Sequence, residues 1–223
     1  ACAAEMRRLV LFSGLGCDHR LTRPVVVPGV EVLTPDHAEP HPGEDLPAYA
    51  RRVADAHGIG AQDVVGGASF GGMLATEIAR RRKVSGLVLL GSCARPRRLP
   101  ASYRLLERVG PLLPDVFLGL RSWAQLVRRR FAPMTPEGVA VLQAMAADCP
   151  PARIRAFGRM LMAWDGVESF DCPLLSIHGD RDTIIPPSCA EPGLMLKDAG
   201  HSFTLTHAPQ TADAIAAFLA KLR

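Results

Sequence analysis

The sequence predicts an α/β protein built on a mostly parallel, doubly wound sheet of about six strands. Short apolar runs that end at glycine, serine or proline alternate with segments of helical composition near both ends of the chain. Such runs are typical of parallel strands that helices cover on both faces. With 223 residues, 48% of them hydrophobic and 22% charged, the chain can bury one large core without disulfide or metal. The functional groups of such a sheet are expected at the carboxyl ends of its strands.

The amino-terminal part of this alternation runs from residue 7 to residue 93. Its apolar runs stop at structure-breaking residues: the first ends at Ser13-Gly14 and the second at Pro35. Glu44-Asp45 opens an apolar stripe with helical spacing, and the segment after Ser69 ends in a basic turn, which a helix dipole favours. Strands are therefore expected at 9–12, 30–35, 64–65 and 84–90, and helices at 45–57 and 70–82.

Residues 95–170 interrupt the alternation, because they contain no convincing strand and prolines cut them into short helices. We expect a core made of residues 1–94 and 171–223, with residues 95–170 as a helical cap insertion over the strand ends. The alternation then resumes, with strands expected at 174–177 and 194–196 and a terminal amphipathic helix at 211–223.

The composition argues against several classes of function. The net charge is only +4, and the densest basic runs, Arg80–Lys83 and Arg128–Arg130, lack interleaved aromatics, so we interpret them as solvated helix faces rather than a nucleic-acid site. No apolar run approaches the ~20 residues that span a bilayer, and no signal core precedes the first strand. The six cysteines are scattered without a C-x-x-C pair, which predicts reduced thiols and no zinc site. We expect a cytoplasmic protein, with no membrane or nucleic-acid partner.

Gly67-Ala68-Ser69-Phe70-Gly71 has the pattern G-x-S-x-G of a nucleophile elbow. The chemistry needs this spacing, because the serine must stand on a sharp strand-to-helix turn and the glycines leave room for neighbouring backbone. The pattern follows an apolar strand and opens a helix, which is the required context. The alternative is a tight glycine turn that serves only packing. We interpret Ser69 as a nucleophile.

A serine nucleophile needs a base and an acid to orient that base. His201 lies in a turn between the last strand and the terminal helix and is the first choice as base. His178 and His207 are second choices. The segment after residue 178 offers two carboxylates, Asp180 and Asp182. The other four histidines are interpreted as surface or satisfied core residues: His19, His37, His41 and His57.

The order Ser69, acid, His201 resembles that of the α/β-hydrolase superfamily, and residues 179–186 resemble its G-x-x-D-x-x-x-P loop. The resemblance is to serine esterases of the carboxylesterase type and to those that cleave methyl esters of pimeloyl-carrier protein. It implies that Asp182 is the acid and that the backbone amides of Leu15 and Phe70 form the oxyanion hole. Serine stands at position 13, where the family often has histidine. We expect the first two of the family's eight strands to be missing or vestigial in this chain.

The resemblance implies hydrolysis of a small-molecule carboxylic ester through an acyl-enzyme, with no cofactor and no metal. Thioester or C–C bond hydrolysis, acyl transfer and a lyase reaction could use the same three residues, because fold does not determine substrate. A ligand-binding homologue without activity is a further alternative. A monomer and a homodimer are both compatible with the sequence.

Two features of the insertion bear on the substrate. Its large apolar residues either line an acyl pocket or form the core of the insertion: Trp123, Phe131, Met160, Met162 and Trp164. Its arginines either dock an acidic acyl-carrier protein or reflect an arginine-rich composition: Arg104, Arg108, Arg121, Arg128, Arg153, Arg155 and Arg159.

Overall fold

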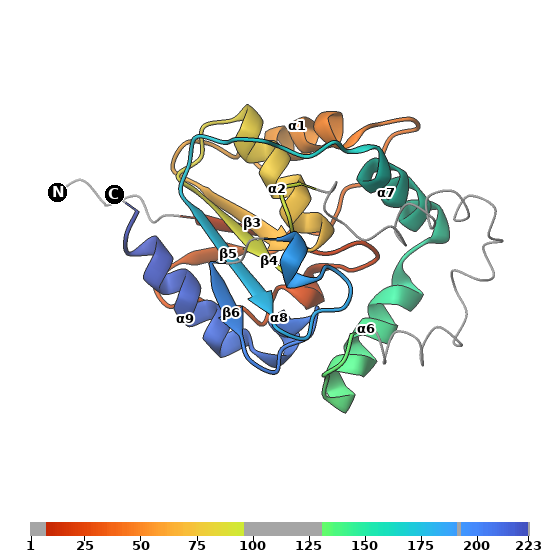
Figure 1. Cartoon of the computed structure of the whole chain (residues 1–223). Coiled ribbons are helices and arrows are strands. Elements are labelled where there is room, and N and C mark those ends of the chain that lie inside the picture. Colours follow the sequence, from red (N-terminus) through yellow and green to blue (C-terminus); the bar gives the residue numbers. More distant parts are fainter. Residues whose placement is uncertain (1–7, 96–130, 191–192, 223) are drawn as a thin grey trace.

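The computed structural model describes residues 8–95, 131–190 and 193–222. These residues contain one six-stranded sheet with the order β2-β1-β3-β4-β5-β6, in which every neighbouring pair is parallel (Figure 1). The predicted fold class is therefore confirmed. The strands are β1 (Arg8–Phe12), β2 (Glu31–Leu33), β3 (Val64–Ala68), β4 (Gly86–Leu90), β5 (Leu174–Gly179) and β6 (Leu194–Leu196).

Helices cover both faces of the sheet (Figure 1). α1 (Leu46–Ala56) and α2 (Phe70–Arg81) lie on one face, and α9 (Ala208–Leu219) lies on the other. α9 begins earlier than the apolar stripe predicted, because Pro209 fits in the first turn of a helix, where its missing N–H is not needed. The short helices are η1 (His19–Leu21), η4 (Pro187–Cys189) and α8 (Phe203–Thr206).

The core divides into two layers because side chains alternate along each strand. Val10 and Phe12 of β1 face α1 and α2, and belong to one cluster of buried residues. Leu9 and Leu11 face the opposite way, in a second cluster with Ile215 of α9. The two central strands, β3 and β4, therefore carry apolar residues at every position, as the sequence pattern predicted for strands with two covered faces.

α6 (Pro136–Asp148) and α7 (Pro151–Ala163) lie between β4 and β5 in the chain. Both begin with a proline, and the Thr135 side chain accepts a hydrogen bond from the Gly138 amide as the α6 N-cap. Residues 131–170 contain these two helices and no strand. The predictions for Trp123, Arg104, Arg108, Arg121 and the run Arg128–Arg130 lie outside the described residues.

Two general properties concern the environment of the chain. None of the helices in the described ranges is both long and apolar enough to cross a membrane. The five described cysteines are free thiols: Cys17, Cys93, Cys149, Cys172 and Cys189.

Candidate active site

Ser69 occupies the sharp turn between β3 and α2, with backbone angles φ 51° and ψ −118°. A residue with a side chain rarely adopts a positive φ, and such strain tends to be retained at functional positions. Backbone crowds both flanking glycines: a Cβ on Gly67 would lie 2.5 Å from the Phe12 oxygen, and one on Gly71 would lie 2.5 Å from the Ser13 oxygen. Only glycine fits at either position, which gives the G-x-S-x-G pattern its physical reason.

Hydrogen bonds from the neighbouring strand end hold the Ser69 peptide in this turn. The Ser69 amide donates to the Leu90 carbonyl of β4 at 3.0 Å. The Ser92 hydroxyl, which is fully buried, donates to the Ser69 carbonyl at 2.6 Å. The Ser69 side chain itself is half-buried. Hydrogen bonds with Leu90 and Ser92 therefore hold the turn in place, while the Ser69 side chain can reach solvent.

Asp182 and His201 form a buried hydrogen-bonded pair. Asp182 follows β5 and His201 follows β6, so the parallel sheet places both at its carboxyl edge. The distance from the Asp182 Oδ2 to the His201 Nδ1 is 2.7 Å. The other carboxylate oxygen accepts the amides of Ile184 and Ile185 at 2.8 and 3.0 Å. The carboxylate thus fixes the orientation of the imidazole through its Nδ1.

His178 is a second histidine on the same carboxylate. Its side chain is fully buried, and its Nε2 lies 2.7 Å from the Ile185 carbonyl and 3.2 Å from the Asp182 Oδ2. A carbonyl can only accept, so Nε2 carries the proton. The Nδ1 is buried and has no partner among the described residues. His178, a second choice for the base in the sequence, therefore contacts the Asp182 carboxylate from a fully buried position.

The surroundings keep Asp182 ionised. Burial opposes the charge, but the charge of a protonated His201 and hydrogen bonds from His178 and His201 outweigh it, so the pKa of Asp182 falls well below its usual value. An anionic partner holds the proton on the His201 Nδ1, which leaves the Nε2 as the basic atom.

Asp180 plays a different part from Asp182. It is exposed, and its carboxylate accepts the Ala199 amide at 3.2 Å, which ties the two loops together. Asp182 is the carboxylate that contacts His201.

The structure brings Ser69 to the neighbourhood of this pair without a direct hydrogen bond. Gly91 directly follows the β4 residue that binds the Ser69 amide. A Cβ on Gly91 would lie 3.4 Å from both the Asp182 Oδ2 and the His201 carbonyl oxygen. Within the described ranges no hydrogen bond joins the Ser69 hydroxyl to the His201 imidazole. Such contacts in ligand-free enzymes often tighten only when substrate binds.

The two amides proposed for the oxyanion hole lie beside the turn that carries Ser69. Leu15 lies in a tight turn closed by a 3.1 Å bond from the Cys17 amide to the Gly14 carbonyl, and Gly16 has the positive φ of 74° that this turn requires. A Cβ on Gly14 would lie 3.6 Å from the Ser69 Cβ. Phe70 is the first residue of α2, so the helix offers its amide no carbonyl partner.

His37 is a residue that the sequence assigned to the surface or the core. It is buried, and its Nε2 lies 2.9 Å from the Ser13 carbonyl, at the start of the Leu15 loop. Its ring contacts Phe70 and Phe157 at centroid distances of 5.6 and 5.0 Å. Its place in the sequence could have marked it as a functional residue, because His37 follows β2 at the carboxyl edge of the sheet, where functional groups collect.

Residues of the insertion contact this site. The Phe131 ring meets the His201 ring edge-on at 5.7 Å, and a Cβ on Gly16 would lie 3.9 Å from Ile154 of α7. Met160 and Trp164 instead pack into the core cluster beneath α7, and the indole of Trp164 donates to Glu77 of α2 at 3.2 Å. These two side chains anchor the insertion to the core.

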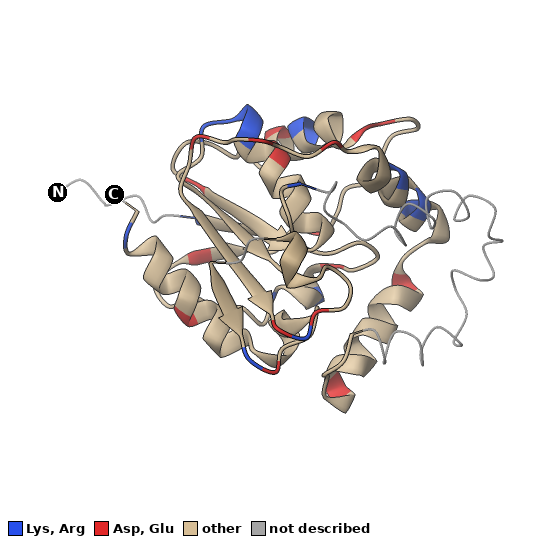
Figure 2. Cartoon of the chain, in the orientation of Figure 1, with Lys and Arg blue, Asp and Glu red and all other residues tan. Residues whose placement is uncertain are grey.

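Ion pairs also connect the insertion to the core. Arg20 of η1 reaches Asp148 at the end of α6 at 2.6 Å, and Arg153 of α7 reaches Glu39 at 2.8 Å. In Figure 2 the ribbon has blue positions on α7 and red positions on α6, the two helices that make these pairs. Solvent and salt screen exposed pairs of this kind, so the buried apolar contacts carry most of the anchoring.

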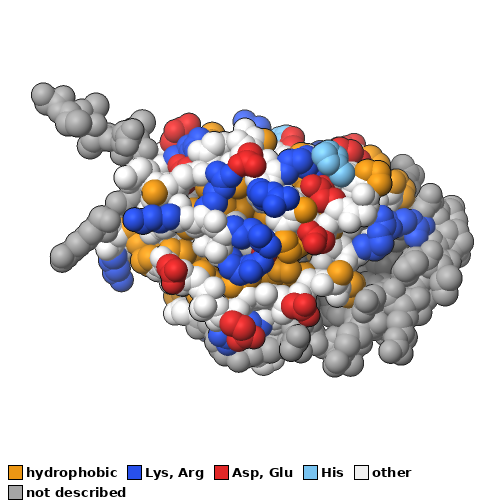
Figure 3. All heavy atoms as spheres, turned by 90° about the horizontal axis from the view of Figure 1, so that it is seen from above, with side chains coloured by type: hydrophobic (Ala, Val, Ile, Leu, Met, Phe, Trp, Pro, Cys, Tyr) orange, Lys and Arg blue, Asp and Glu red, His pale blue; other side chains and the backbone are white. Residues whose placement is uncertain are grey.

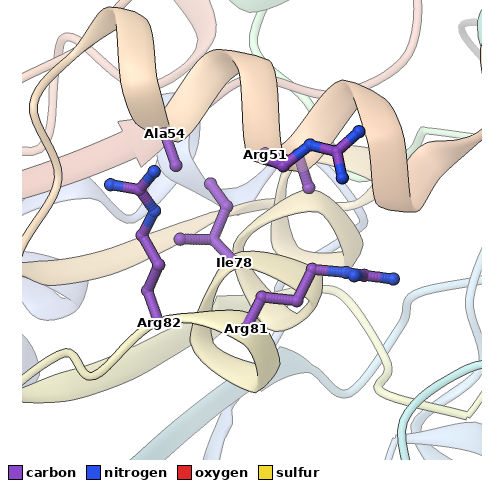
Figure 4. A pocket seen from close by; sticks show the side chains of 6 residues that line it. Arg51, Ala54, Ile78, Arg81 and Arg82 are labelled. Carbon is purple, nitrogen blue, oxygen red and sulfur yellow. The ribbon is translucent and has the colours of Figure 1, made fainter.

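A separate hollow lies between α1 and α2 and is remote from Ser69. Its volume is about 290 Å³, and Ile78 forms its apolar floor between Arg51, Arg81 and Arg82 (Figure 4). It lies at the last turn of α2, whereas Ser69 precedes the first turn, which separates them by roughly 15–20 Å. Basic and acidic side chains alternate over this face (Figure 3). Pairs such as Arg82 with Asp55 reduce its positive charge.

A group of potential metal ligands, Asp18, His19 and Asp36, lies on the surface beyond the Leu15 loop. Asp18 is bound by the Arg20 guanidinium at 2.9 and 3.0 Å, and Asp36 accepts the His19 amide at 2.8 Å. Their oxygens already have protein donors, so these residues are explained without a metal.

The sequence comparison identifies the family of the chain. A family model described as the alpha/beta hydrolase family matches residues 9–214. The chain belongs to this family. The match runs from β1 into α9 and so includes Ser69, Asp182 and His201. No curated protein sequence matches the chain.

This α/β hydrolase is similar to solved structures over nearly its whole length. An esterase from Thermogutta terrifontis has a TM-score of 0.77 at 22% identity, covering 97% of this chain and 90% of that one. An enol-lactonase from Burkholderia xenovorans has a TM-score of 0.77 at 19% identity, with coverages of 99% and 94%. An esterase from Rhodococcus has a TM-score of 0.75 at 16% identity, with coverages of 99% and 93%. At these identities the likeness establishes the fold.

Proposed function

We propose that this α/β hydrolase is a serine esterase that cleaves a carboxylic ester through an acyl-enzyme. The observation that carries the proposal is the buried Asp182–His201 hydrogen bond, which lies at the strand edge beside the strained turn of Ser69. A carboxylate that orients an imidazole next to an elbow serine is the arrangement that activates a hydroxyl for attack on a carbonyl.

In the proposed first step, the His201 Nε2 accepts the proton of Ser69 while the serine oxygen attacks the ester carbonyl carbon. The amides of Leu15 and Phe70 donate hydrogen bonds to the oxyanion that forms. Asp182 stabilises the imidazolium. As the tetrahedral intermediate collapses, the bond to the alkoxy oxygen breaks, and His201 returns its proton to the leaving alcohol.

In the second step, water attacks the acyl-enzyme with His201 again as the base. The carboxylic acid leaves and the proton returns to Ser69. No hydrogen bond joins the Ser69 hydroxyl to the His201 imidazole among the described residues, so this contact must form in the substrate complex.

We assign residues 95–170 to a cap that restricts the substrate. The contact of Phe131 with His201 and the approach of Ile154 to the Leu15 loop support this role, because both place apolar side chains near the reacting groups. An apolar acyl group is therefore the expected substrate class. Thioester hydrolysis is the second candidate, since the same groups would attack a thioester carbonyl.

The test is hydrolysis of p-nitrophenyl esters of increasing chain length, alongside the matching thioesters. Ser69→Ala should abolish turnover and labelling by a fluorophosphonate. Ser85→Ala is the matched control, because this serine lies before β4 at the opposite edge of the sheet and its hydroxyl makes only a 3.4 Å contact with the Gln62 carbonyl. Turnover that persists in Ser69→Ala would remove the basis of the proposal.

A further inference from the structure

His37 occupies a position where one side chain meets both halves of the proposed oxyanion hole. The His37 Nε2 lies 2.9 Å from the Ser13 carbonyl oxygen, one peptide before the turn that carries the Leu15 amide. The His37 ring meets the Phe70 ring edge-on at 5.6 Å, and Phe70 carries the second amide. The Ser13 carbonyl only accepts, so the Nε2 is the protonated nitrogen.

The surroundings of His37 restrain it strongly. It belongs to an aromatic cluster made of His37, Tyr49, Phe70 and Phe157, in which the two phenylalanine rings lie 5.0 Å apart. Phe157 belongs to α7, so a residue of the insertion packs against His37 in this cluster. A ring packed on several sides has one available orientation, and its N–H is therefore aimed at one carbonyl.

Packing alone does not explain a histidine in this place. The His37 Nδ1 is buried with no partner in the described part of the chain, and burying an unpaired polar atom is unfavourable. A phenylalanine would fill the same volume without that cost. Burial also lowers the pKa of His37, even though the Ser13 carbonyl opposes this, so the ring stays neutral at the pH of an esterase assay. What the histidine supplies beyond volume is its Nε2–H donor.

We propose that His37 is a positioning residue for the oxyanion hole: its N–H fixes the loop that carries the Leu15 amide, and its ring supports the residue that carries the Phe70 amide. The inference rests on the proposed esterase function. His37 does not touch the substrate. It acts by keeping the two amides at the spacing that the oxyanion requires, and displacement of such groups by a fraction of an ångström weakens transition-state binding.

The test compares His37→Phe, which keeps the aromatic volume and removes the donor, with His37→Gln, whose terminal N–H₂ can reach the same carbonyl. Tyr49→Phe is the matched control, because it removes a 3.0 Å hydrogen bond to the Ala38 carbonyl from the same cluster without touching the Leu15 loop. For each variant kcat and KM on a p-nitrophenyl ester are measured together with the midpoint of thermal unfolding.

We expect His37→Phe to lower kcat about tenfold, less than the ~10²–10³ lost with a whole oxyanion donor, because the amide is displaced rather than removed. KM should change by less than about twofold, since ground-state binding is untouched. His37→Gln should recover most of kcat, and Tyr49→Phe should keep the wild-type kcat.

Wild-type kcat in His37→Phe would overturn the inference, as would an equal loss in Tyr49→Phe or no recovery in His37→Gln. Should His37→Phe fail to fold, His37→Met takes its place, because methionine adapts to irregular gaps and has no N–H donor. Activity that survives Ser69→Ala in the same assay would instead refute the esterase proposal itself, so the two failures are distinguishable.

Discussion

Replacing Asp182 with asparagine tests the acid–base pair most directly. One oxygen of Asp182 accepts the amides of Ile184 and Ile185. The other is hydrogen-bonded to the His201 Nδ1 and lies 3.2 Å from the His178 Nε2. Asparagine keeps one acceptor oxygen, which the two amides will occupy. The NH₂ group of the asparagine then faces the His178 Nε2 and the His201 Nδ1, which had both carried protons. His201 must therefore move its proton to Nε2 and accept at Nδ1, which leaves it unable to act as a base.

The expected loss follows from this change of tautomer. A base held in the wrong tautomer costs about 10⁴ in kcat, as known for the equivalent substitution in a serine protease. That factor corresponds to ~5 kcal/mol of transition-state stabilisation. KM should change little, because the substrate does not contact the buried carboxylate.

The assay is p-nitrophenyl ester hydrolysis near neutral pH, with circular dichroism to verify folding. Asp180→Asn is the matched control, since this carboxylate lies in the same loop, is exposed, and binds only the Ala199 amide among the contacts described. It should retain activity within about twofold. A folded Asp182→Asn variant with more than a tenth of the wild-type kcat, or a larger loss in Asp180→Asn, would refute the assignment of the acid.

Two further predictions concern stability. The pKa of Asp182 is lower in the folded chain than its unfolded value of about 3.9, so its ionisation stabilises the fold above about pH 4, and this contribution is lost as the pH falls below that value. The free energy of unfolding, measured with urea, should therefore fall less between pH 5 and pH 3 in Asp182→Asn than in the wild type. An equal fall in both proteins would contradict this. Gly71→Ala should lower the unfolding midpoint by roughly 6–12 °C, because its Cβ would lie 2.5 Å from the Ser13 oxygen and overpacking of backbone costs ~3 kcal/mol. Gly158→Ala in α7 is the control, because nothing lies within 4 Å of the added Cβ, and it should raise the unfolding midpoint slightly. Equal effects of the two substitutions would show that crowding is not the cause.

Local patterns in the sequence were sufficient for the sheet and the elbow. Buried parallel strands need apolar residues at consecutive positions, so β3, β4 and β5 were visible as short runs. The elbow was visible because crowding by backbone permits only glycine beside Ser69. The edge on which Asp182 and His201 lie follows from parallel strand direction, and the choice of Asp182 over Asp180 came from the loop pattern.

The tertiary structure alone decided which groups support these residues. His178 and His201 share one carboxylate, although His178 lies near the end of β5 and His201 follows β6, and the Ile185 carbonyl determines the protonated nitrogen of His178. His37 contacts the Ser13 carbonyl and the Phe157 ring, which come from segments far apart in the chain. Sequence periodicity reports whether a side chain is buried, whereas the partner and tautomer of a buried histidine depend on which acceptor the folded chain places against it.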